Sequence, residues 1–573
     1  VMEIETPINK KDLVRIKDKY GREGMGYETV DDSNLKNYNY ISLIDSQIYY
    51  NIKKRFGKCS ILLKKFKDFA EFKDSFRVEG WDAISVLKGK ILDERKNIIL
   101  NTGDTIDIED IKSYRNIQIE DELEVIIIKK TDNMIKLSDY VISFFEKQNI
   151  KNIFAVPGSA NVHLLDSIGR NTNIKCIFTQ TEQAAAMATE SYIKLTRNPA
   201  ILMISSGTSG TNALTGVADA WVDSTPLVVI SGQANSDLSI SKLSIRQLGI
   251  QQLDIVNIAK PITKYSIMIT DPNKIKYHLE KALFLAKDKR QGPVWIDIPI
   301  DILGMNIDEE KLASFDPSEI KKSINYNLLK KKVSETILLI KNSKRPVILA
   351  GNGIRLAKAE KEFMKFIEFL SIPVLTSRRG ADLLKDNYPL FFGRPGAYGQ
   401  RAANFIIQNC DLLISIGSRL SLPQIGRNYN AFTREAKRII VDIDKDELEK
   451  KTIKADIVIN YDAKDFILEM LNQLSDSDKS NSSDWIKKCT GWKLKFRQSS
   501  EQGRLERKLV NPYNFIEVLS DELNEGDIIT IDGGSSNVFA MQAFKFKESQ
   551  RLISSTGLEN SFFALPASIG ACI

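Results

Sequence analysis

Histidine is almost missing from this sequence. The 573 residues include only two, His163 and His278, and none precedes residue 134. Each stands alone in a segment with the apolar spacing of a helix, where a lone histidine usually serves packing. We therefore expect neither of them to be catalytic.

Cysteine is scarce as well. The five cysteines lie far apart, without the close spacing of a zinc site or a disulfide framework, which indicates a reducing compartment. No apolar run is long enough to span a bilayer and no signal peptide is visible, so we expect a cytoplasmic protein. The chain starts at Val1 and stops at Ile573 within an apolar run, and we interpret it as a fragment open at both ends.

The chain also lacks an excess of charge of one sign. Its 81 basic and 74 acidic residues leave a net charge of +7, spread along the chain, so we expect neither nucleic acid nor a membrane as a partner. With 43% apolar and 27% charged residues, the composition is that of a globular protein. A length of 573 residues suggests three or four domains.

The sequence is organised around three short apolar strands, each followed by a loop that could carry chemistry. Residues 153–156 lead into a Pro-Gly turn, and residues 174–178 lead to Glu182. Residues 200–204 lead into a Gly/Ser/Thr loop that ends at Asn212. Strands alternating with helical segments predict a parallel sheet covered on both faces. Ligands of such sheets bind at the carboxyl ends of the strands, where all three loops lie.

Glu182 allows two interpretations. With Thr179 it fits the Thr-x-x-Glu pattern of a helix capping box, and a carboxylate in the first turn suits the helix dipole. Its surroundings favour a chemical role instead, because the Pro-Gly turn and the Gly-rich loop would meet it at one edge of the sheet.

Six motifs follow one another in a fixed order: Val156-Pro157-Gly158, Thr181-Glu182-Gln183, Gly207-Thr-Ser-Gly-Thr-Asn212, Asp223-Ser-Thr-Pro226, Gly232-Gln233 and Gly292-Pro-Val-Trp-Ile-Asp-Ile-Pro299. This order resembles that of thiamine-diphosphate-dependent enzymes, and most closely that of the acetolactate (acetohydroxyacid) synthase large subunit. The resemblance runs from about Met134 to the end of the chain.

The resemblance implies a role for each motif. Glu182 matches the carboxylate that hydrogen-bonds the aminopyrimidine of the cofactor and favours its imino form, which then takes the thiazolium proton. Contacts to thiamine diphosphate are implied for Val156, Pro157, Gly158, Gly207 and Asn212. Gln251 and Lys264 match residues of the substrate pocket, although a polar surface role fits them equally well.

The implied fold class is α/β, with three domains built on doubly wound parallel sheets. The predicted ranges are 134–305 for a pyrimidine-binding domain, 325–470 for a central domain and 506–573 for a truncated diphosphate-binding domain. Met134 should open the first helix of this series. Charged and serine-rich residues at 305–325 and 470–505 are expected to be linkers.

Residues 1–132 differ from the rest of the chain in their pattern of predicted secondary structure. Short strands separated by glycines predict a small antiparallel barrel, at 60–63, 83–87, 98–100, 105–108 and 123–128. The later strands resemble part of a cupin barrel. Because this segment has no histidine, the resemblance implies a metal-free cupin with a sugar-binding or structural role.

Thiamine diphosphate and Mg²⁺ are the cofactors that the resemblance implies. The Gly-Asp-Gly segment that holds the metal in the family is expected beyond Ile573, so no residue of this chain is assigned to the metal. FAD is doubtful, because Ser418-Arg419-Leu420-Ser421-Leu422 stands where the synthase has Arg-Phe-Asp-Asp-Arg. Gly396-Ala-Tyr-Gly399 replaces its Gly-Met-His-Gly, and Ser561 replaces the Met that supports the bent cofactor.

The expected activity is that of a thiamine-diphosphate-dependent carboligase or decarboxylase acting on pyruvate or another small 2-oxo acid. Since the family builds each site from two subunits, a homodimer or homotetramer is implied. The alanine-rich helix after Glu182 would lie at the subunit contact, or would pack within its own chain. The alternative function is that of a non-catalytic relative, in which a sugar-binding cupin is tethered to a cofactor-less scaffold.

Overall fold

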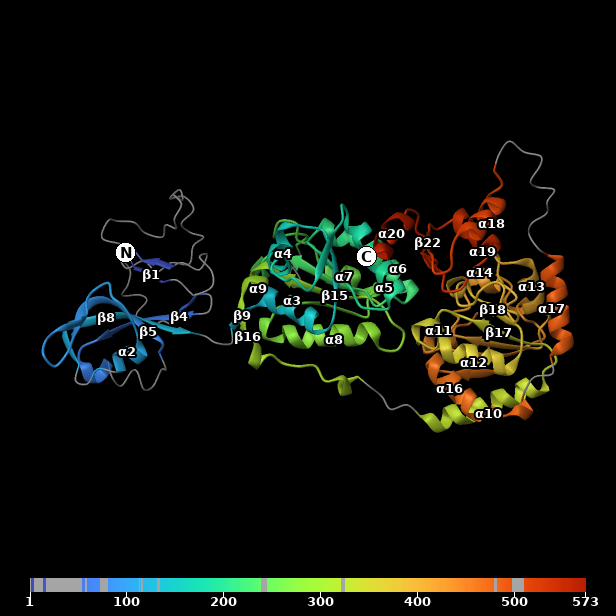
Figure 1. Cartoon of the computed structure of the whole chain (residues 1–573), viewed down its shortest axis with the longest axis horizontal. Coiled ribbons are helices and arrows are strands. Elements are labelled where there is room, and N and C mark those ends of the chain that lie inside the picture. The colour runs from blue at the N-terminus through green and yellow to red at the C-terminus, as the bar shows by residue number, and fades with distance from the viewer. Residues whose placement is uncertain are drawn as a thin grey trace. The chain divides into compact units, whose positions relative to one another are not determined.

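The computed structural model divides the chain into two compact units. The first comprises residues 1–140 and 304–312, and the second comprises residues 141–303 and 313–573. The structure describes residues 2–4, 14–16, 54–56, 59–72, 81–112, 114, 117–130, 134–238, 245–320, 325–478, 482–496 and 510–573. None of the helices in these ranges is both long and apolar enough to cross a membrane. Figure 1 labels the elements.

The first unit is built on an antiparallel sheet with the order β3-β4-β8-β5-β6, in which β7 also pairs with β5. Its elements are β3 (Lys54–Phe56), β4 (Cys59–Phe66), β5 (Ala83–Leu92), β6 (Ile98–Leu100), β7 (Thr105–Asp107), α2 (Ile108–Lys112) and β8 (Gln118–Lys130). Alternate residues Leu123, Val125 and Ile127 of β8 are buried, as the period of two requires. The predicted short antiparallel strands are confirmed. The likeness to a cupin stays a prediction, because much of residues 1–80 lies outside the described ranges.

The second unit begins with a sheet of six parallel strands in the order β11-β10-β12-β13-β15-β14. The strands are β10 (Asn152–Ala155), β11 (Lys175–Phe178), β12 (Ile201–Ile204), β13 (Val228–Gln233), β14 (Tyr265–Met268) and β15 (Val294–Pro299). Every residue of β10, β12, β13 and β15 is buried, which is the mark of a sheet covered by helices on both faces. The predicted parallel sheet is confirmed.

The prediction that a helix opens at Met134 is wrong at its first residues. Residues 134–136 form β9 (Met134–Lys136), which pairs antiparallel with β16 (Asn306–Asp308). The helix α3 (Leu137–Lys147) begins after this strand. The partner strand lies some 170 residues away in sequence, so local apolar spacing could not reveal it.

A second parallel sheet has the order β18-β17-β19-β20-β21. Its strands are β17 (Pro346–Ala350), β18 (Val374–Thr376), β19 (Leu412–Ile416), β20 (Lys437–Val441) and β21 (Ile457–Ile459). The helices around it are α10 (Tyr326–Asn342), α11 (Gly353–Leu356), α12 (Glu360–Leu370), α13 (Arg401–Asn409) and α16 (Ala463–Gln473). This arrangement confirms the strand-loop-helix series predicted for the central domain.

Part of the predicted linker 470–505 is instead a helix, α17 (Ser483–Lys495). Its Trp485 and Cys489, one turn apart, are buried, and the Trp485 Nε1 donates to the Pro346 carbonyl at 3.2 Å. The many Lys and Ser residues hid this narrow apolar face.

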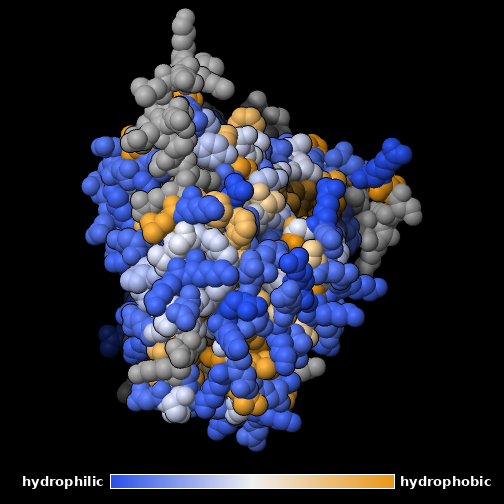
Figure 2. Space-filling model, turned by 90° about the vertical axis from the view of Figure 1, so that its right-hand side faces the viewer, coloured by the Kyte–Doolittle hydropathy of each residue, from blue (hydrophilic) through white to orange (hydrophobic). Residues whose placement is uncertain are grey.

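The face of the molecule drawn in Figure 2 is mainly hydrophilic, and its apolar residues, drawn in orange, lie in small separate groups.

The last part of the chain contributes a pair of parallel strands, β22 and β23, and three helices. These elements are α18 (Pro512–Glu522), β22 (Ile528–Ile531), α19 (Ser535–Ala543), β23 (Arg551–Ser554) and α20 (Ala564–Cys572). Helix α20 packs on α5 (Glu182–Thr196): the Ser191 hydroxyl donates to the Ala567 carbonyl at 2.7 Å. A Cβ on Gly570 would lie 2.0 Å from the Ala188 carbonyl oxygen. The alanines of α5 therefore pack within the chain, which is one of the two alternatives that the sequence left open.

Helices α5 and α6 (Thr208–Asp223) run side by side in the same direction. Polar contacts join their first turns and their last turns, and small residues meet between them. A Cβ on Gly216 of α6 would lie 2.5 Å from the Cβ of Ala186 on α5. Because real Cβ atoms do not approach so closely, the spacing of the two helices depends on a glycine at this position.

We predict that Gly216→Ala destabilises the protein by about 1–3 kcal/mol, because the added methyl group forces α5 and α6 apart. A fall in the midpoint of thermal unfolding, followed by circular dichroism, would report this. Gly491→Ala on the exposed face of α17 is the matched control, since nothing lies within 4 Å of its new Cβ. The control should be neutral or slightly stabilising, by up to about 1 kcal/mol. Equal midpoints for the two variants would contradict the prediction.

Candidate active site

Glu182 is the first residue of α5 and follows strand β11. The helix cap is Thr181, whose hydroxyl accepts the backbone N–H of Ala184 at 3.3 Å. The capping box predicted from Thr179 is therefore wrong, because the cap lies two residues later. The Glu182 carboxylate, released from a capping role, stands half-buried at the carboxyl edge of the sheet.

Two residues in the first turns of α6 hold this carboxylate. The Ser209 hydroxyl donates to Oε1 of Glu182 at 2.7 Å, and Nδ2 of Asn212 donates to Oε2 at 3.0 Å. The Ser209 hydroxyl also accepts the backbone N–H of Ser205 at 3.0 Å. The structure thus brings Asn212 to Glu182, as the shared sheet edge predicted. Ser209 was missed, although the spacing of three residues places it on the same helical face as Asn212.

The Pro-Gly turn lies at the same edge, between strand β10 and its helix. The Gly158 N–H donates to Oδ1 of Asn161 at 2.9 Å, and Nδ2 of Asn161 donates to the Val156 carbonyl at 3.0 Å. A Cβ on Gly158 would lie 2.4 Å from the Cβ of Ser205, in the loop after β12. The two loops touch so closely that only glycine fits. Pro157 is exposed beside them.

Gly207 opens helix α6 with a φ of +63°, which favours glycine. A Cβ there would lie 2.5 Å from the carbonyl oxygen of Gln251, so the loop that carries Gln251 rests on the start of α6. The side chain of Gln251 is exposed, and its neighbour Ile250 has 90% of its surface exposed. The structure thus brings Gln251 next to the loop that supplies Ser209.

A buried carboxyl group, Asp297 on β15, supports the loop that carries Gln251 through the side chain of Gln233. It accepts hydrogen bonds from Ser231 at 2.5 Å and from Nε2 of Gln233 at 2.9 Å, and the same Nε2 donates to the Leu253 carbonyl. Burial raises the pKa of Asp297 to about 7, and the two hydrogen bonds offset this only in part. Gln233 therefore links the sheet to the loop two residues after Gln251.

Lys264 lies elsewhere. It precedes β14, so it stands at the amino edge of the same parallel sheet, opposite the edge that carries Glu182. Its ammonium group donates to the carbonyl of Asp288 at 2.5 Å and to that of Arg290 at 2.8 Å. Burial lowers the pKa of Lys264 to about 8. The structure does not bring Lys264 to the Glu182 group, and these bonds give it a structural role in holding the loop before β15.

A buried charged cluster lies at the far end of α5 and α6. The carboxylates of Glu190, Asp219 and Asp223 approach within 4.8 Å of one another, a grouping that could in principle hold a metal. The Lys194 ammonium already lies 2.9 Å from Glu190 and 2.8 Å from Asp223. Burial, reinforced by Asp219, raises the pKa of Glu190 to about 8. Because the Lys194 ammonium group already pairs with two of the three carboxylates, we assign no metal to this cluster.

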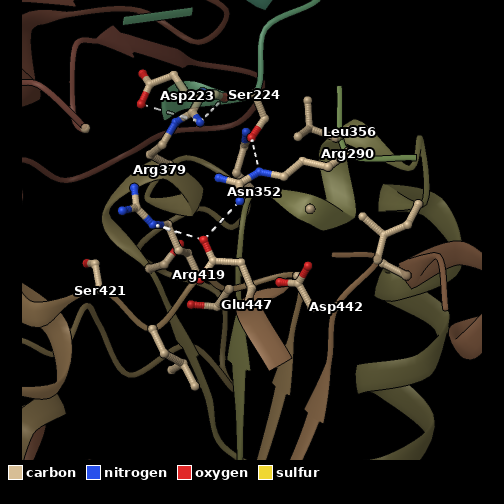
Figure 3. A pocket seen from close by; sticks show the side chains of 18 of the residues that line it. Asp223, Ser224, Arg290, Asn352, Leu356, Arg379, Arg419, Ser421, Asp442 and Glu447 are labelled. Carbon is tan, nitrogen blue, oxygen red and sulfur yellow. Dashed lines mark hydrogen bonds and ion pairs between the residues drawn. The ribbon is translucent and has the colours of Figure 1, made fainter. Parts of the chain in front are cut away.

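A hollow of about 970 Å³ in the second unit lies between its two parallel sheets. The loops after β17, β18, β19 and β20 line it, so it opens at the carboxyl edge of the second sheet. In Figure 3, Arg290 reaches into it and pairs with Glu447 at 3.0 Å. Arg290 also pairs with Asp444 at 2.8 Å. A Cβ on Gly353 would lie 2.6 Å from the Cα of Gly417, so two of the loops touch along their backbones.

The comparisons with known proteins agree with this geometry. Two family models match: the N-terminal TPP binding domain of thiamine pyrophosphate enzymes over residues 135–258, and their central domain over residues 333–471.

Three relatives are described as large subunits of acetolactate synthase. The probable subunit of Methanocaldococcus jannaschii is 33% identical over 447 residues, which cover 76% of this chain and 73% of that protein. That of Lactococcus lactis is 32% identical over 435 residues, 76% and 73% of the two chains. That of Corynebacterium glutamicum is 30% identical over 439 residues, 75% and 67% of the two chains. With two parallel sheets that confirm the α/β fold, these matches establish that the chain belongs to the thiamine pyrophosphate enzyme family.

Proposed function

We propose that the protein is a thiamine-diphosphate-dependent carboligase or decarboxylase that acts on pyruvate or another small 2-oxo acid. The observation that carries the proposal is the Glu182 carboxylate, fixed by Ser209 and Asn212 at the carboxyl edge of a parallel sheet. The relatives described as acetolactate synthases support the choice of substrate class. The alternative is a non-catalytic relative with a cofactor-less scaffold. That function would not explain why two side chains hold the half-buried Glu182 carboxylate.

The residues present fit the pyrimidine half of the cofactor. A carboxylate offers about four acceptor positions, and Ser209 and Asn212 use one on each oxygen of Glu182. The remaining positions are open to a donor on the cofactor ring. When bound, thiamine diphosphate supplies a carbon acid and an electron sink that amino acid side chains lack. Val156, Pro157 and Gly158 would contact it from the neighbouring loop, together with Gly207.

The part of Glu182 is to hold a proton donor of the cofactor ring and to favour the tautomer that acts as a base. Ser209 and Asn212 keep its two oxygens in one orientation, so the carboxylate needs no reorganisation when the ring arrives. Partial burial strengthens the effect of this single charge. Asn212 is on this account a positioning residue that acts through Glu182, rather than a direct contact.

We also propose that the site needs a second copy of the chain and Mg²⁺. In the family, Glu182 of one subunit faces the diphosphate-binding domain of another, and the metal belongs to that half. Three large apolar side chains of the second unit are mostly exposed and suit a subunit contact: Ile250 at 90%, Phe562 at 80% and Leu565 at 74%. The dispersed cysteines support a cytoplasmic location. We also propose that residues 1–132 form a cupin-like domain with a sugar-binding or structural role.

We predict that Glu182→Gln retains the fold but loses at least about 100-fold in turnover of pyruvate, because a neutral amide cannot favour the tautomer that acts as base. The exchange of the thiazolium proton with solvent, followed by NMR in the presence of bound cofactor, should slow in parallel. Glu190→Gln, on the same helix but remote from the loops, is the control and should exchange at the normal rate. Unchanged exchange in Glu182→Gln would contradict the proposed role.

Ser209→Ala should lower turnover about 10-fold while the affinity for thiamine diphosphate changes little, because the carboxylate loses one of its two donors but stays in place. The split between kcat and the cofactor dissociation constant is the measurement. Thr211→Ala is the control, since the Thr211 hydroxyl bonds the Thr208 carbonyl and does not touch Glu182. An equal loss in both variants would show that the effect is general to the helix.

We further predict that the protein purified under mild conditions carries no flavin. Ser418-Arg419-Leu420-Ser421-Leu422 departs from the flavin-contacting pattern of the synthase, and Arg419 is engaged by Glu447 at 3.2 Å. The absorption spectrum should therefore show no flavin band. A stoichiometric yellow chromophore would contradict this prediction and would indicate a flavin-containing acetolactate synthase.

A further inference from the structure

A second, smaller hollow of about 80 Å³ lies next to the large one and shares part of its lining, including Ser224, Asn352 and Arg379. It is enclosed by the end of α5, the residues before β13, the loop after β17, the turn after β18 and strand β23. Seven of its lining residues are cationic: Lys194, Arg197, Arg355, Lys358, Arg378, Arg379 and Arg551. Among the described residues that line it, none is acidic.

The neighbouring carboxylates neutralise this charge only in part. Four of them pair with the cations from outside the lining: Asp223, Glu360, Asp382 and Glu559. Asp382 serves two cations at once, at 2.9 Å from Arg355 and 2.9 Å from Arg551. Glu190 also lies 2.9 Å from Lys194, and burial raises the pKa of this carboxyl group. With Asp219 of the adjacent cluster also counted, six carboxylates face seven cations, so the surroundings of the hollow keep a net positive charge.

This excess of charge is held in a poorly hydrated place. The side chains of Arg355 and Lys194 are 8% and 9% exposed. Burial and then the neighbouring Arg355 lower the pKa of Arg551, as expected when like charges crowd together. Asp223 and Asp382 each pair with two of the buried cations, so a bound anion would offset the repulsion that remains among them.

One polar group in the lining also lacks a partner. Among the described residues, nothing accepts a hydrogen bond from the buried Nε of Arg378. The terminal nitrogen Nη1 of the same guanidinium pairs with Glu559 at 2.9 Å. A guanidinium offers donors in a planar fork that matches the oxygens of a phosphate, and Nε of Arg378 is a donor of this fork that no described residue uses.

We propose that this hollow, which we call the cationic pocket, binds one tetrahedral oxyanion: free phosphate or the phosphoryl group of a larger ligand. Its volume holds a few water molecules or one small oxyanion, but no nucleotide. Arg378 and Arg379 line both hollows, so a phosphoryl group seated between them could carry an organic part that extends into the larger one. The arginines supply charge and direction at once.

The cationic pocket is distinct from the proposed thiamine diphosphate site. Ser224, Thr225 and Pro226 precede β13, so the pocket touches the amino edge of the first sheet. Glu182 and its loops lie at the opposite, carboxyl edge. The inference does not rest on the proposed function, and binding can be measured without turnover.

The test is titration of the full chain with inorganic phosphate by isothermal calorimetry at constant ionic strength, with saturating thiamine diphosphate and Mg²⁺ present. We expect saturable binding that Arg378→Gln weakens at least about 10-fold and that Lys358→Gln, at the exposed rim, weakens less. Lys361→Gln, exposed on α12 and outside the lining, is the charge-matched control and should bind as the wild type does. Sulfate should compete, whereas chloride should not.

The same titration with glucose 1-phosphate separates the two sources of the oxyanion. If the natural ligand carries an organic part, Arg419→Gln, which lines only the larger hollow, should weaken the sugar phosphate but not phosphate. If free phosphate is the ligand, Arg419→Gln should change neither. No saturable phosphate binding, or equal affinity in the wild type, Arg378→Gln and Lys358→Gln, would overturn the proposal. Circular dichroism of each variant guards against a loss of fold.

Discussion

The close contact between α5 and α6 is the constraint on which the rest of the second unit depends. At Ala186 and Gly216 the two helices meet with no room for another atom. This contact sets the distance at which Ser209 and Asn212 reach Glu182 on one side. On the other side it sets the distance between Lys194 and Asp223, whose ion pair is buried. A single packing contact thus governs both a polar site at a sheet edge and a charged cluster deep in the fold.

The glycines of the site have a shared physical meaning. Gly158 and Gly207 do not mark flexible loops, because each lies where a Cβ would strike a neighbouring loop. Gly158 fixes the loops after β10 and β12 to each other, and Gly207 fixes the loop of Gln251 to the start of α6. The carboxyl edge of the first sheet is therefore a set of interlocked backbones, which suits a site that must hold one carboxylate in one orientation.

The sequence was sufficient for what short motifs and strand patterns encode. The α/β class, both parallel sheets and the meeting of Glu182 with Asn212 followed from apolar strands and the loops after them. Ser209 and Asn161 were missed because their roles depend on hydrogen bonds to neighbouring loops and helices. Residue spacing alone gives only a weak indication of such bonds. The capping box failed because Thr181, a better placed hydroxyl, competes with Thr179 for the same helix end.

For Lys264 the sequence left a pocket role and a polar surface role open, because motif order does not say at which end of a strand a residue lies. The remaining errors have a different origin. The strand at Met134 pairs with residues far along the chain, and tertiary pairing of this kind overrides local spacing. Helix α17 carries its apolar face on few residues, so its composition resembled that of a linker.

Helix α5 has a consequence for communication within the molecule. It begins at Glu182 and its last turn carries Lys194, a lining residue of the cationic pocket. Fifteen residues at about 1.5 Å each make a helix of about 22 Å that joins these two places. An anion that moves Lys194 would thus act as an effector on Glu182. Thermodynamic linkage then requires that a ligand held at Glu182 changes the affinity for that anion by the same factor.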